Sequence, residues 1–337
     1  MIMELERFDL SQGAGVQYGS NVLRSLLAND MPGVDLLVRE AIQNSLDANS
    51  SVSDSVKVEF TFEDFNLNRL EGLLDNATVK RISTLFGSAS NRSLCYRDSG
   101  TVGLSGAGRF DELPEDAQEL GNFLKLVSSI GLPQEQEGAG GSWGYGKTVF
   151  FRVSRVPVMY YSRFRDGADF RERLVFALIE DQTNREKSIL LNRTGFAWWG
   201  VGNDGKCIFP CEDRVRISGI LDRLGIAPFI GDETGTVIFM PCLAEGQVPR
   251  ADPEDRTPPW WVSRDGESNS DLLADYTQVA IQRWYSPRLQ NDGFPRPPLL
   301  TAFVNDDEVG AEENLPLFEI IRDLHRVGEG KQPVSAE

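Results

Sequence analysis

The chain has 337 residues, of which 34 are basic and 51 acidic, so its formal net charge is −17. This charge argues against a surface built mainly to bind nucleic-acid phosphates, which needs clustered Lys and Arg, although a local patch or a partner protein could still contact DNA. Hydrophobic residues make up 40% of the chain, which argues against wholesale disorder, and the length suggests about two domains.

The sequence favours a cytoplasmic protein without a membrane anchor. No apolar run is long enough to cross a bilayer, and the N-terminal segment carries acidic residues where a signal peptide carries basic ones. Four cysteines, Cys95, Cys207, Cys211 and Cys242, are too few for a disulfide framework in this chain. Cys207 and Cys211 could bind a metal but lack a second close pair, so we expect reduced thiols. A single histidine, His325, excludes most histidine-based catalysis.

The first half of the chain alternates helical and extended patterns. A helix is expected to begin near Pro32, a residue favoured in a first helical turn, and to end near Asn49. Residues 56–65 alternate apolar and polar side chains as a strand does. The other elements expected here are a helix over 67–86, a short strand over 94–98, a helix over 114–130 and a glycine-dense loop over 137–147.

The second half becomes rich in aromatic and β-branched residues and then returns to helical patterns. Proline, charge and small polar residues over 246–270 indicate a linker. The segment after this linker is small for an independent domain, so we expect it to pack on the first. The expected elements are strands over 148–164, 173–180, 195–202 and 234–241 with a helix near 214–224, then a helix over 271–285, a strand over 299–305 and a helix over 315–326.

The first predicted helix has a polar side that presents Glu40, Asn44 and Asp47. An Asn amide oxygen is a ligand that suits Mg²⁺, and a Glu one turn earlier can orient and deprotonate a water. A solvated polar face would give the same pattern, so this motif is weak alone. The opposite side, which we expect to be buried, is formed by Leu37, Val38, Ala41, Ile42 and Ser45.

A second motif follows the short strand over 94–98, where Asp98 precedes Gly100 and Gly103. A buried carboxylate can accept a hydrogen bond from the exocyclic amine of adenine. Glycines allow the backbone to pass close to a flat base. An ordinary Asp-Ser-Gly turn would explain the same residues.

Two further segments complete the set. The glycine-dense loop contains Gly141, Gly144, Gly146, Lys147 and Thr148. Its backbone N–H groups could surround phosphates, and its lysine adds a positive charge; a merely flexible loop is the alternative. The last segment is Gly235-Thr236 at the start of a strand, which carries little information alone.

Taken in order, these four segments resemble the GHKL superfamily of ATPases, which includes gyrase B, Hsp90, histidine kinases and MutL. The segment REAIQNSLDA resembles the N-box, RDSGTVGLSG the adenine-binding motif, GGSWGYGK the ATP lid, and ETGTVIF the final Gly-Thr strand. The resemblance covers about residues 30–242. It implies an α+β class and a two-layer α/β sandwich, the Bergerat fold, with ATP and Mg²⁺ as ligands.

The resemblance also implies residue roles. Glu40 would be the catalytic base, and Asn44 would hold Mg²⁺. Asp98 would bind the adenine amine, with Gly100 and Gly103 shaping the pocket, while Asp47 would support the adenine or ribose side. Thr236 would lie behind the adenine. The lid residues that would bind the nucleotide are Gly141, Gly144, Gly146, Lys147 and Thr148.

The chain departs from the family pattern in two places. The second glycine of the adenine motif comes one residue later than usual, as Gly103. No histidine lies near the phosphoacceptor position of a sensor kinase, since His325 follows the ATP-binding part, so kinase activity is not expected. We expect an ATP-binding domain over 1–245, a linker over 246–270 and a small transducer-like α/β segment over 271–337, too short for a complete transducer domain.

Three interpretations of the function stay open. The first is slow, magnesium-dependent ATP hydrolysis, with ATP driving lid closure or an ATP-dependent homodimer and so controlling a partner effector protein. The wording of the motifs also resembles standalone bacterial members associated with phage defence and DNA transactions. The second is a P-loop NTPase, because Gly141–Thr148 fits G-x-x-x-x-G-K-[ST], although no strand is expected before it. The third is an ATP-gated scaffold with negligible hydrolysis.

Overall fold

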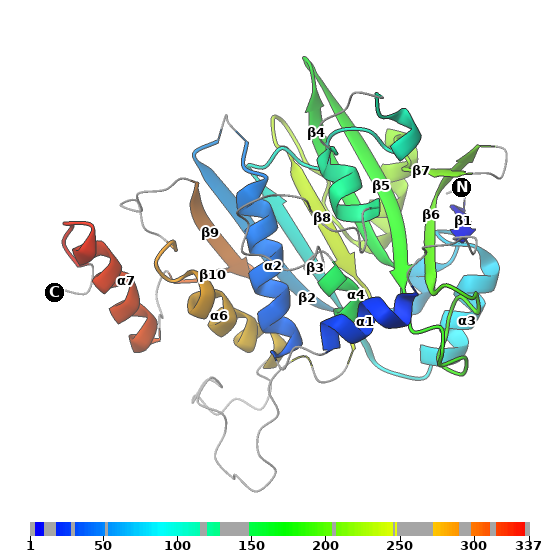
Figure 1. Ribbon diagram of the computed structural model, residues 1–337, viewed down its shortest axis with the longest axis horizontal. Coiled ribbons are helices and arrows are strands. Elements are labelled where there is room, and N and C mark those ends of the chain that lie inside the picture. The colour runs from blue at the N-terminus through cyan, green and yellow to red at the C-terminus, as the bar shows by residue number, and fades with distance from the viewer. Residues whose placement is uncertain are drawn as a thin grey trace, which may run out of the picture. The chain divides into compact units, whose positions relative to one another are not determined.

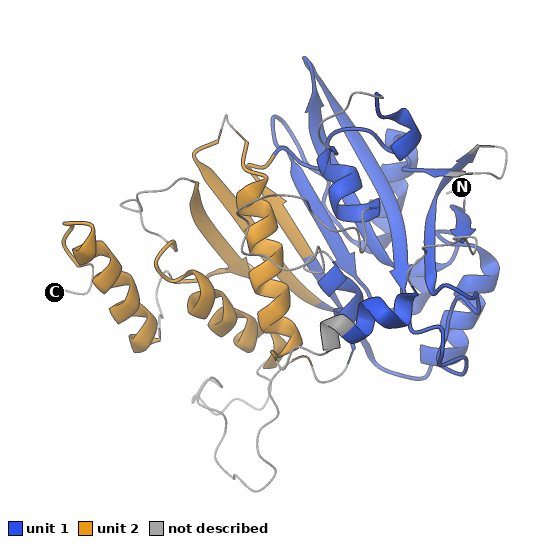
Figure 2. Cartoon of the chain, viewed as in Figure 1, with its two compact units in different colours: residues 1–30, 63–95, 102–244 blue, residues 31–62, 96–101, 245–337 orange. Residues whose placement is uncertain are grey.

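The chain folds into a mixed α+β structure, as the sequence predicts (Figure 1). The computed structural model describes residues 4–9, 18–27, 31–50, 53–114, 120–128, 148–203, 207–244, 247, 272–289, 298–310 and 315–333. The chain divides into two compact units that are interleaved along the sequence (Figure 2). Unit 1 comprises Met1–Asp30, Glu63–Cys95 and Val102–Ala244, and unit 2 comprises Met31–Phe62, Tyr96–Thr101 and Glu245–Glu337.

Unit 1 is built on antiparallel strands in the order β1-β6-β5-β4-β8, with β7 paired to β6. The first five residues of strand β4 are all buried, so the strand is covered on both faces, as its nearly continuous apolar run requires. Its Met159 and Tyr161 join the main core with α3 and α5, whereas Tyr160 lies against Phe150 of α4. The strands are β1 (Glu6–Asp9), β4 (Val158–Asp166), β5 (Asp169–Ile179), β6 (Phe196–Asn203), β7 (Cys207–Phe209) and β8 (Gly235–Met240).

The helices of unit 1 differ in part from the expected ones. Residues 67–86 form a 3₁₀ turn and a separate helix, since Gly72 between them has a φ of +70°. The segment expected as one strand over 148–164 begins with a short helix before β4. Of the helix expected over 114–130, the described part is helical only from 122 to 128. The helices are α1 (Gly19–Leu27), η1 (Leu67–Leu70), α3 (Asn76–Phe86), η2 (Phe110–Glu112), η3 (Leu124–Ser128), α4 (Val149–Val153) and α5 (Arg214–Leu224).

Unit 2 joins segments from both ends of the chain. Strand β2 (Ser55–Phe65) pairs in parallel with β9 (Leu299–Val304), and β9 pairs antiparallel with β10 (Asp307–Glu308). Val56, Val58 and Phe60 of β2 are buried with polar residues between them, as the predicted alternation requires. The helices are α2 (Gly33–Asp47), α6 (Leu272–Tyr285) and α7 (Pro316–Gly328).

Strand β3 (Asn91–Ser99) contributes its first residues to unit 1 and Tyr96–Ser99 to unit 2. The expected linker over 246–270 lies outside the described residues, except for Gln247, whose carbonyl accepts a hydrogen bond from Val34 N at 3.0 Å. Among the described helices, none has the length and apolar character needed to cross a membrane.

Candidate functional site

Helix α2 carries the predicted base and metal ligand, and its orientation follows from its apolar stripe. Pro32 precedes the first turn with φ −52° and ψ 146°. The polar side holds Glu40 and Asn44, both half-buried, and the exposed Asp47. The stripe that the sequence predicts to be buried is confirmed, since no more than 2% of each residue is exposed: Leu37, Val38, Ala41, Ile42 and Ser45.

Asp98 lies near the end of β3 and is 5% exposed. Its Oδ2 accepts a hydrogen bond from Ser45 Oγ of α2 at 2.7 Å, and its Oδ1 accepts one from Thr101 Oγ1 at 2.6 Å. A hydroxyl on each oxygen fixes the plane of the carboxylate. The structure thereby brings the first two sequence motifs together within unit 2.

A tyrosine extends this network. The Tyr96 hydroxyl lies 2.6 Å from Ser45 Oγ and donates to the carbonyl of Ala41 at 3.1 Å. Burial, and secondly the neighbouring Asp98 carboxylate, raise the pKa of Tyr96 well above its ordinary value, so the phenol keeps its proton. Ser45, Tyr96 and Thr101 are not among the site residues that the motifs predict. A serine within the apolar stripe was the one sequence signal for them, because a buried hydroxyl needs a partner.

Gly100 occupies a turn that no other residue type fits well. Its φ is +79°, and a Cβ there would collide with the carbonyl oxygen of Ser55. The Gly100 carbonyl accepts a hydrogen bond from Ser50 N at 3.0 Å. The predicted glycine therefore sets the path of the chain directly after Asp98.

Glu40 is in an environment that suits a proton acceptor. Burial raises the pKa of its carboxyl, and Arg39, whose Nε is 3.7 Å from Glu40 Oε1, opposes that shift. Helix α6 contributes Tyr285, whose hydroxyl donates to the Arg39 carbonyl at 2.7 Å. A carboxylate with a raised pKa is a stronger base than a solvated one.

Asn44 lies one turn after Glu40, and its Nδ2 is buried without a hydrogen-bond partner among the described residues. An unsatisfied buried NH₂ donor fits a group that donates to a ligand such as a phosphate oxygen, whereas a cation would be bound by the amide oxygen. Within the described ranges no group of three His, Cys, Asp or Glu side chains could hold a metal. Asn44 would therefore hold Mg²⁺ only together with oxygens of a phosphate ligand and water, which is a usual arrangement for this ion.

Asp47 is exposed on the surface of α2, and its Oδ1 accepts a hydrogen bond from Gln43 Nε2 at 2.7 Å. No contact within the described part of the chain joins it to Asp98. Its predicted role on the adenine or ribose side stays a prediction.

Unit 1 brings two other predicted residues together. Gly103 has a φ of +65°, and a Cβ there would lie 2.7 Å from both Ser162 Oγ and the Arg163 carbonyl. Ser162 Oγ accepts from Leu104 N at 2.8 Å and donates to the Gly235 carbonyl at 2.7 Å. Its cross-strand neighbour on β8 is Thr236, which is 5% exposed. Ser162, which none of the sequence motifs includes, is the residue that connects the Gly103 turn to the Gly-Thr strand.

Most of the predicted lid cannot be compared with the structure. Gly141, Gly144, Gly146 and Lys147 lie outside the described residues. Thr148 is fully buried at the start of α4.

A buried ionic cluster attaches α2 to α6. Asp35, in the first turn of α2, is 1% exposed. Its carboxylate accepts hydrogen bonds from the Tyr276 hydroxyl, from Arg283 Nη1 at 2.7 Å and from Trp284 Nε1 at 3.1 Å. The Trp284 ring in turn lies under Arg39, with 5.7 Å from Arg39 Cζ to the ring centroid. The C-terminal segment thus contacts the residue next to the predicted base.

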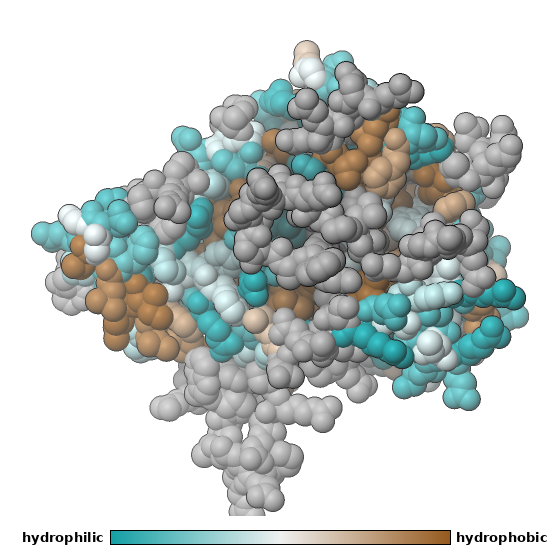
Figure 3. Space-filling model, viewed as in Figure 1, coloured by the Kyte–Doolittle hydropathy of each residue, from teal (hydrophilic) through white to brown (hydrophobic). Residues whose placement is uncertain are grey.

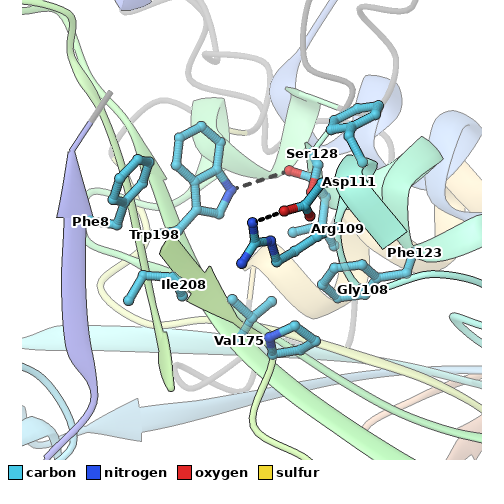
Figure 4. Close-up of a pocket in the computed structure, with 12 residues that line it drawn as sticks. Phe8, Gly108, Arg109, Asp111, Phe123, Ser128, Val175, Trp198 and Ile208 are labelled. Carbon is cyan, nitrogen blue, oxygen red and sulfur yellow. Dashed lines mark hydrogen bonds and ion pairs between the residues drawn. The ribbon is translucent and has the colours of Figure 1, made fainter. Parts of the chain in front are cut away.

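Unit 1 also contains a cavity of about 400 Å³. Figure 4 shows the residues that line it. Arg109, on its wall, is paired with Asp111 and also lies 4.3 Å from the ring centroid of Phe209. The Trp198 indole donates to the Val127 carbonyl at 3.3 Å. Apolar side chains form most of the described wall, among them Phe8, Phe123, Val175, Trp198 and Ile208, and none of the described wall residues is a predicted site residue.

Comparison with known proteins gives no family for this chain. No model of a protein family matches it, and no curated protein sequence matches it significantly.

Proposed function

We propose that the chain is a GHKL-type ATPase that binds ATP with Mg²⁺ and hydrolyses it slowly. The observation that carries the proposal is the buried Asp98 carboxylate, oriented by Ser45 and Thr101 and followed by the tightly constrained Gly100. A fixed carboxylate beside a glycine turn is suited to accept a hydrogen bond from the adenine amine. The Bergerat fold and the roles of Gly103 and Thr236 follow from the resemblance and are part of the proposal.

Hydrolysis would use Glu40 and Asn44. A water attacks the γ-phosphorus of ATP, its proton passes to the Glu40 carboxylate, and the bond to the β-phosphate oxygen breaks to give ADP and phosphate. The raised pKa of Glu40 favours that proton transfer. Mg²⁺, when bound, would neutralise phosphate charge. Asn44 is the described residue of α2 best suited to hold it through its amide oxygen.

The proposal is tested by titrating ATP with Mg²⁺ into wild type and three variants by isothermal calorimetry, with phosphate release measured in parallel. Asp98→Asn should lose detectable nucleotide binding, because an amide replaces one acceptor oxygen by a donor. Glu40→Ala should bind ATP as wild type does and lose turnover. Asp232→Asn, at a carboxylate that is 90% exposed, is the matched control. Wild-type affinity in Asp98→Asn, or full hydrolysis in Glu40→Ala, would contradict the assignment.

The P-loop alternative has one structural observation in its favour, since α4 begins directly after Thr148. That helix has only five residues, which is short for the helix that follows a P-loop. The same titration with a Lys147→Ala variant added separates the two candidates: in a P-loop enzyme Asp98→Asn would bind ATP normally, and Lys147→Ala would not. ATP binding without any phosphate release from wild type would instead favour the ATP-gated scaffold.

The partners remain proposals that rest on this function. We propose either an ATP-dependent homodimer or a partner effector protein, with phage defence or DNA transactions as the setting. The net charge of −17 gives no reason to propose direct nucleic-acid binding.

A further inference from the structure

Helix α7 has most of its apolar residues outside and two of its charged residues inside. Phe318, Arg322 and Asp323 are each no more than 7% exposed. Figure 3 shows the outward side as a hydrophobic patch over α7, at the left of the view. The residues of this outer stripe, with their exposed fractions, are Leu317 (61%), Ile320 (57%), Ile321 (37%), Leu324 (66%) and Val327 (54%). A contiguous apolar patch of this kind on a folded protein marks an interaction site.

The spacing of the outer stripe matches a helix-pairing seam. Leu317, Ile320, Leu324 and Val327 are separated by three, four and three residues, which is the spacing of heptad positions a and d. The order is also nearly symmetric on reversal, since Leu317 corresponds to Val327 and Ile320 to Leu324. A second α7 laid antiparallel would therefore place an aliphatic side chain opposite each aliphatic side chain.

The reversal symmetry of the stripe favours a second copy as the occupant, and the local charge of α7 permits it. The chain carries −17, so two copies repel each other over most of their surface. On α7, Arg322 and Asp323 are buried, and the half-buried Glu319 and Arg326 are opposite in charge and offset each other. Two copies can approach at this helix without bringing like charges into the seam.

The exposed apolar area of the outer stripe is enough for a reversible contact between two copies. Taking roughly 100 Å² of exposed area for each of the five side chains, a symmetric pair would bury about 1,000 Å² in total, the lower limit for a specific interface. We propose that the outer stripe of α7 is the contact of an antiparallel, two-fold homodimer. This dimer needs no nucleotide, so it stands or falls independently of the proposed ATPase function.

Sedimentation velocity without nucleotide, over a wide range of protein concentrations, tests the proposal. Wild type should shift from monomer to dimer as its concentration rises. Leu324→Glu should raise the dissociation constant at least tenfold, because it places two carboxylates in the seam. Val215→Glu, at a residue of α5 that is 84% exposed, should associate as wild type does. Circular dichroism checks that each variant is folded. A wild type that is monomeric throughout, or a Leu324→Glu variant that dimerises equally well, would overturn the proposal.

Cysteine cross-linking tests the orientation. In an antiparallel seam, an Ile320→Cys chain lies opposite a Leu324→Cys chain, so a mixture of the two single variants should form a disulfide-linked dimer under mild oxidation. Neither variant alone should do so beyond the background of the native cysteines, measured on wild type. Efficient cross-linking of each variant with itself, without the mixed product, would show a parallel pair and refute the antiparallel contact.

Discussion

At the scale of single residues, the candidate site depends on how two hydroxyls hold one carboxylate. Ser45 and Thr101 each donate to a different oxygen of Asp98, and the Tyr96 hydroxyl lies 2.6 Å from Ser45 Oγ. The helical periodicity assigns Ser45 to the buried stripe of α2, and the motifs assign no role to Thr101. The orientation of Asp98 is thus a property of the network rather than of the Asp-Ser-Gly sequence alone.

Glu40 should make stability depend on pH in a defined direction. Because burial raises its pKa in the folded protein, the folded state binds a proton more readily than the unfolded state, and stability falls as pH rises through the raised pKa. Glu40→Gln should therefore unfold at a higher temperature than wild type at pH 7, and this difference should shrink as pH falls toward the ordinary Glu value. Thermal melts from pH 4 to 8 measure it. Glu71→Gln, at an exposed site, is the control, and an equal pH-dependent difference there would refute the explanation.

Gly100→Ala should destabilise the protein by more than the left-handed backbone alone accounts for, which is about 1–2 kcal/mol. The excess comes from the collision of the new Cβ with the Ser55 carbonyl. Gly167→Ala separates the two effects, because Gly167 also has a positive φ, +63°, but no atom of the described residues lies within 4 Å of its Cβ position. Urea unfolding compares the two variants; equal losses would show that the Ser55 contact is unimportant.

At the scale of elements, α6 is the support of α2. The Asp35 cluster and the Tyr285 hydrogen bond to the Arg39 carbonyl fasten α6 to the N-terminal half of α2, directly before Glu40. The same unit places β9 beside β2 in parallel register. The C-terminal segment, expected to pack on the first domain, thus packs on α2 and β2.

Asp35→Asn should lower the free energy of unfolding by about 1.5–3 kcal/mol, the range for losing hydrogen bonds to a charged group. The amide cannot accept from the Tyr276 hydroxyl, Arg283 and Trp284 as the carboxylate does, and Arg283 loses its counter-ion. Denaturant unfolding measures the loss, with the exposed Asp232→Asn as the matched control. If turnover is also measured, a reduced kcat with unchanged ATP affinity would indicate that α6 positions Glu40.

At the scale of the whole molecule, the charge of −17 must be reconciled with an anionic ligand. A single nucleotide needs only local compensation, which the resemblance assigns to glycine amides, Mg²⁺ and Lys147. No basic surface is required for that. Association between two copies differs from nucleotide binding, because the negative charges of the two whole surfaces repel each other.

Lys147→Ala should weaken ATP more than ADP, because the proposed lid contacts the terminal phosphate. Calorimetric titration of both nucleotides gives the two affinity ratios directly. Equal losses for ATP and ADP would argue against a lid and keep the P-loop alternative open.

A non-hydrolysable ATP analogue should raise the apparent mass of the Leu324→Glu variant in light scattering. That variant lacks the proposed α7 contact, so any association that the analogue causes must come from another surface. No change in mass at micromolar protein would refute ATP-driven homodimerisation through such a surface and leave a partner effector as the remaining proposal.

Local patterns predicted much of the fold. The stripe of α2 and the alternation of β2 follow from periodicity, which needs only a few consecutive residues. The α+β class is what the resemblance implies. The helix at 149–153 was missed because its aromatic and β-branched residues resemble a strand, and packing against β4 overrides that propensity. The pattern over 67–86 does not predict the break between η1 and α3, because the positive φ of the single residue Gly72 produces it.

The sequence by itself predicted the buried side of α2 from local periodicity, and its short motifs identified Glu40, Asn44, Asp98 and Gly100 as candidates. The α+β class followed from the resemblance that these motifs carry together. Only the tertiary structure decided that Ser45 and Thr101 hold Asp98, that Asp35 attaches α2 to α6, and that the apolar side of α7 faces outward. These features depend on contacts between distant parts of the chain. No local pattern encodes them, because the same side chain is a core residue or an exposed one according to what folds against it.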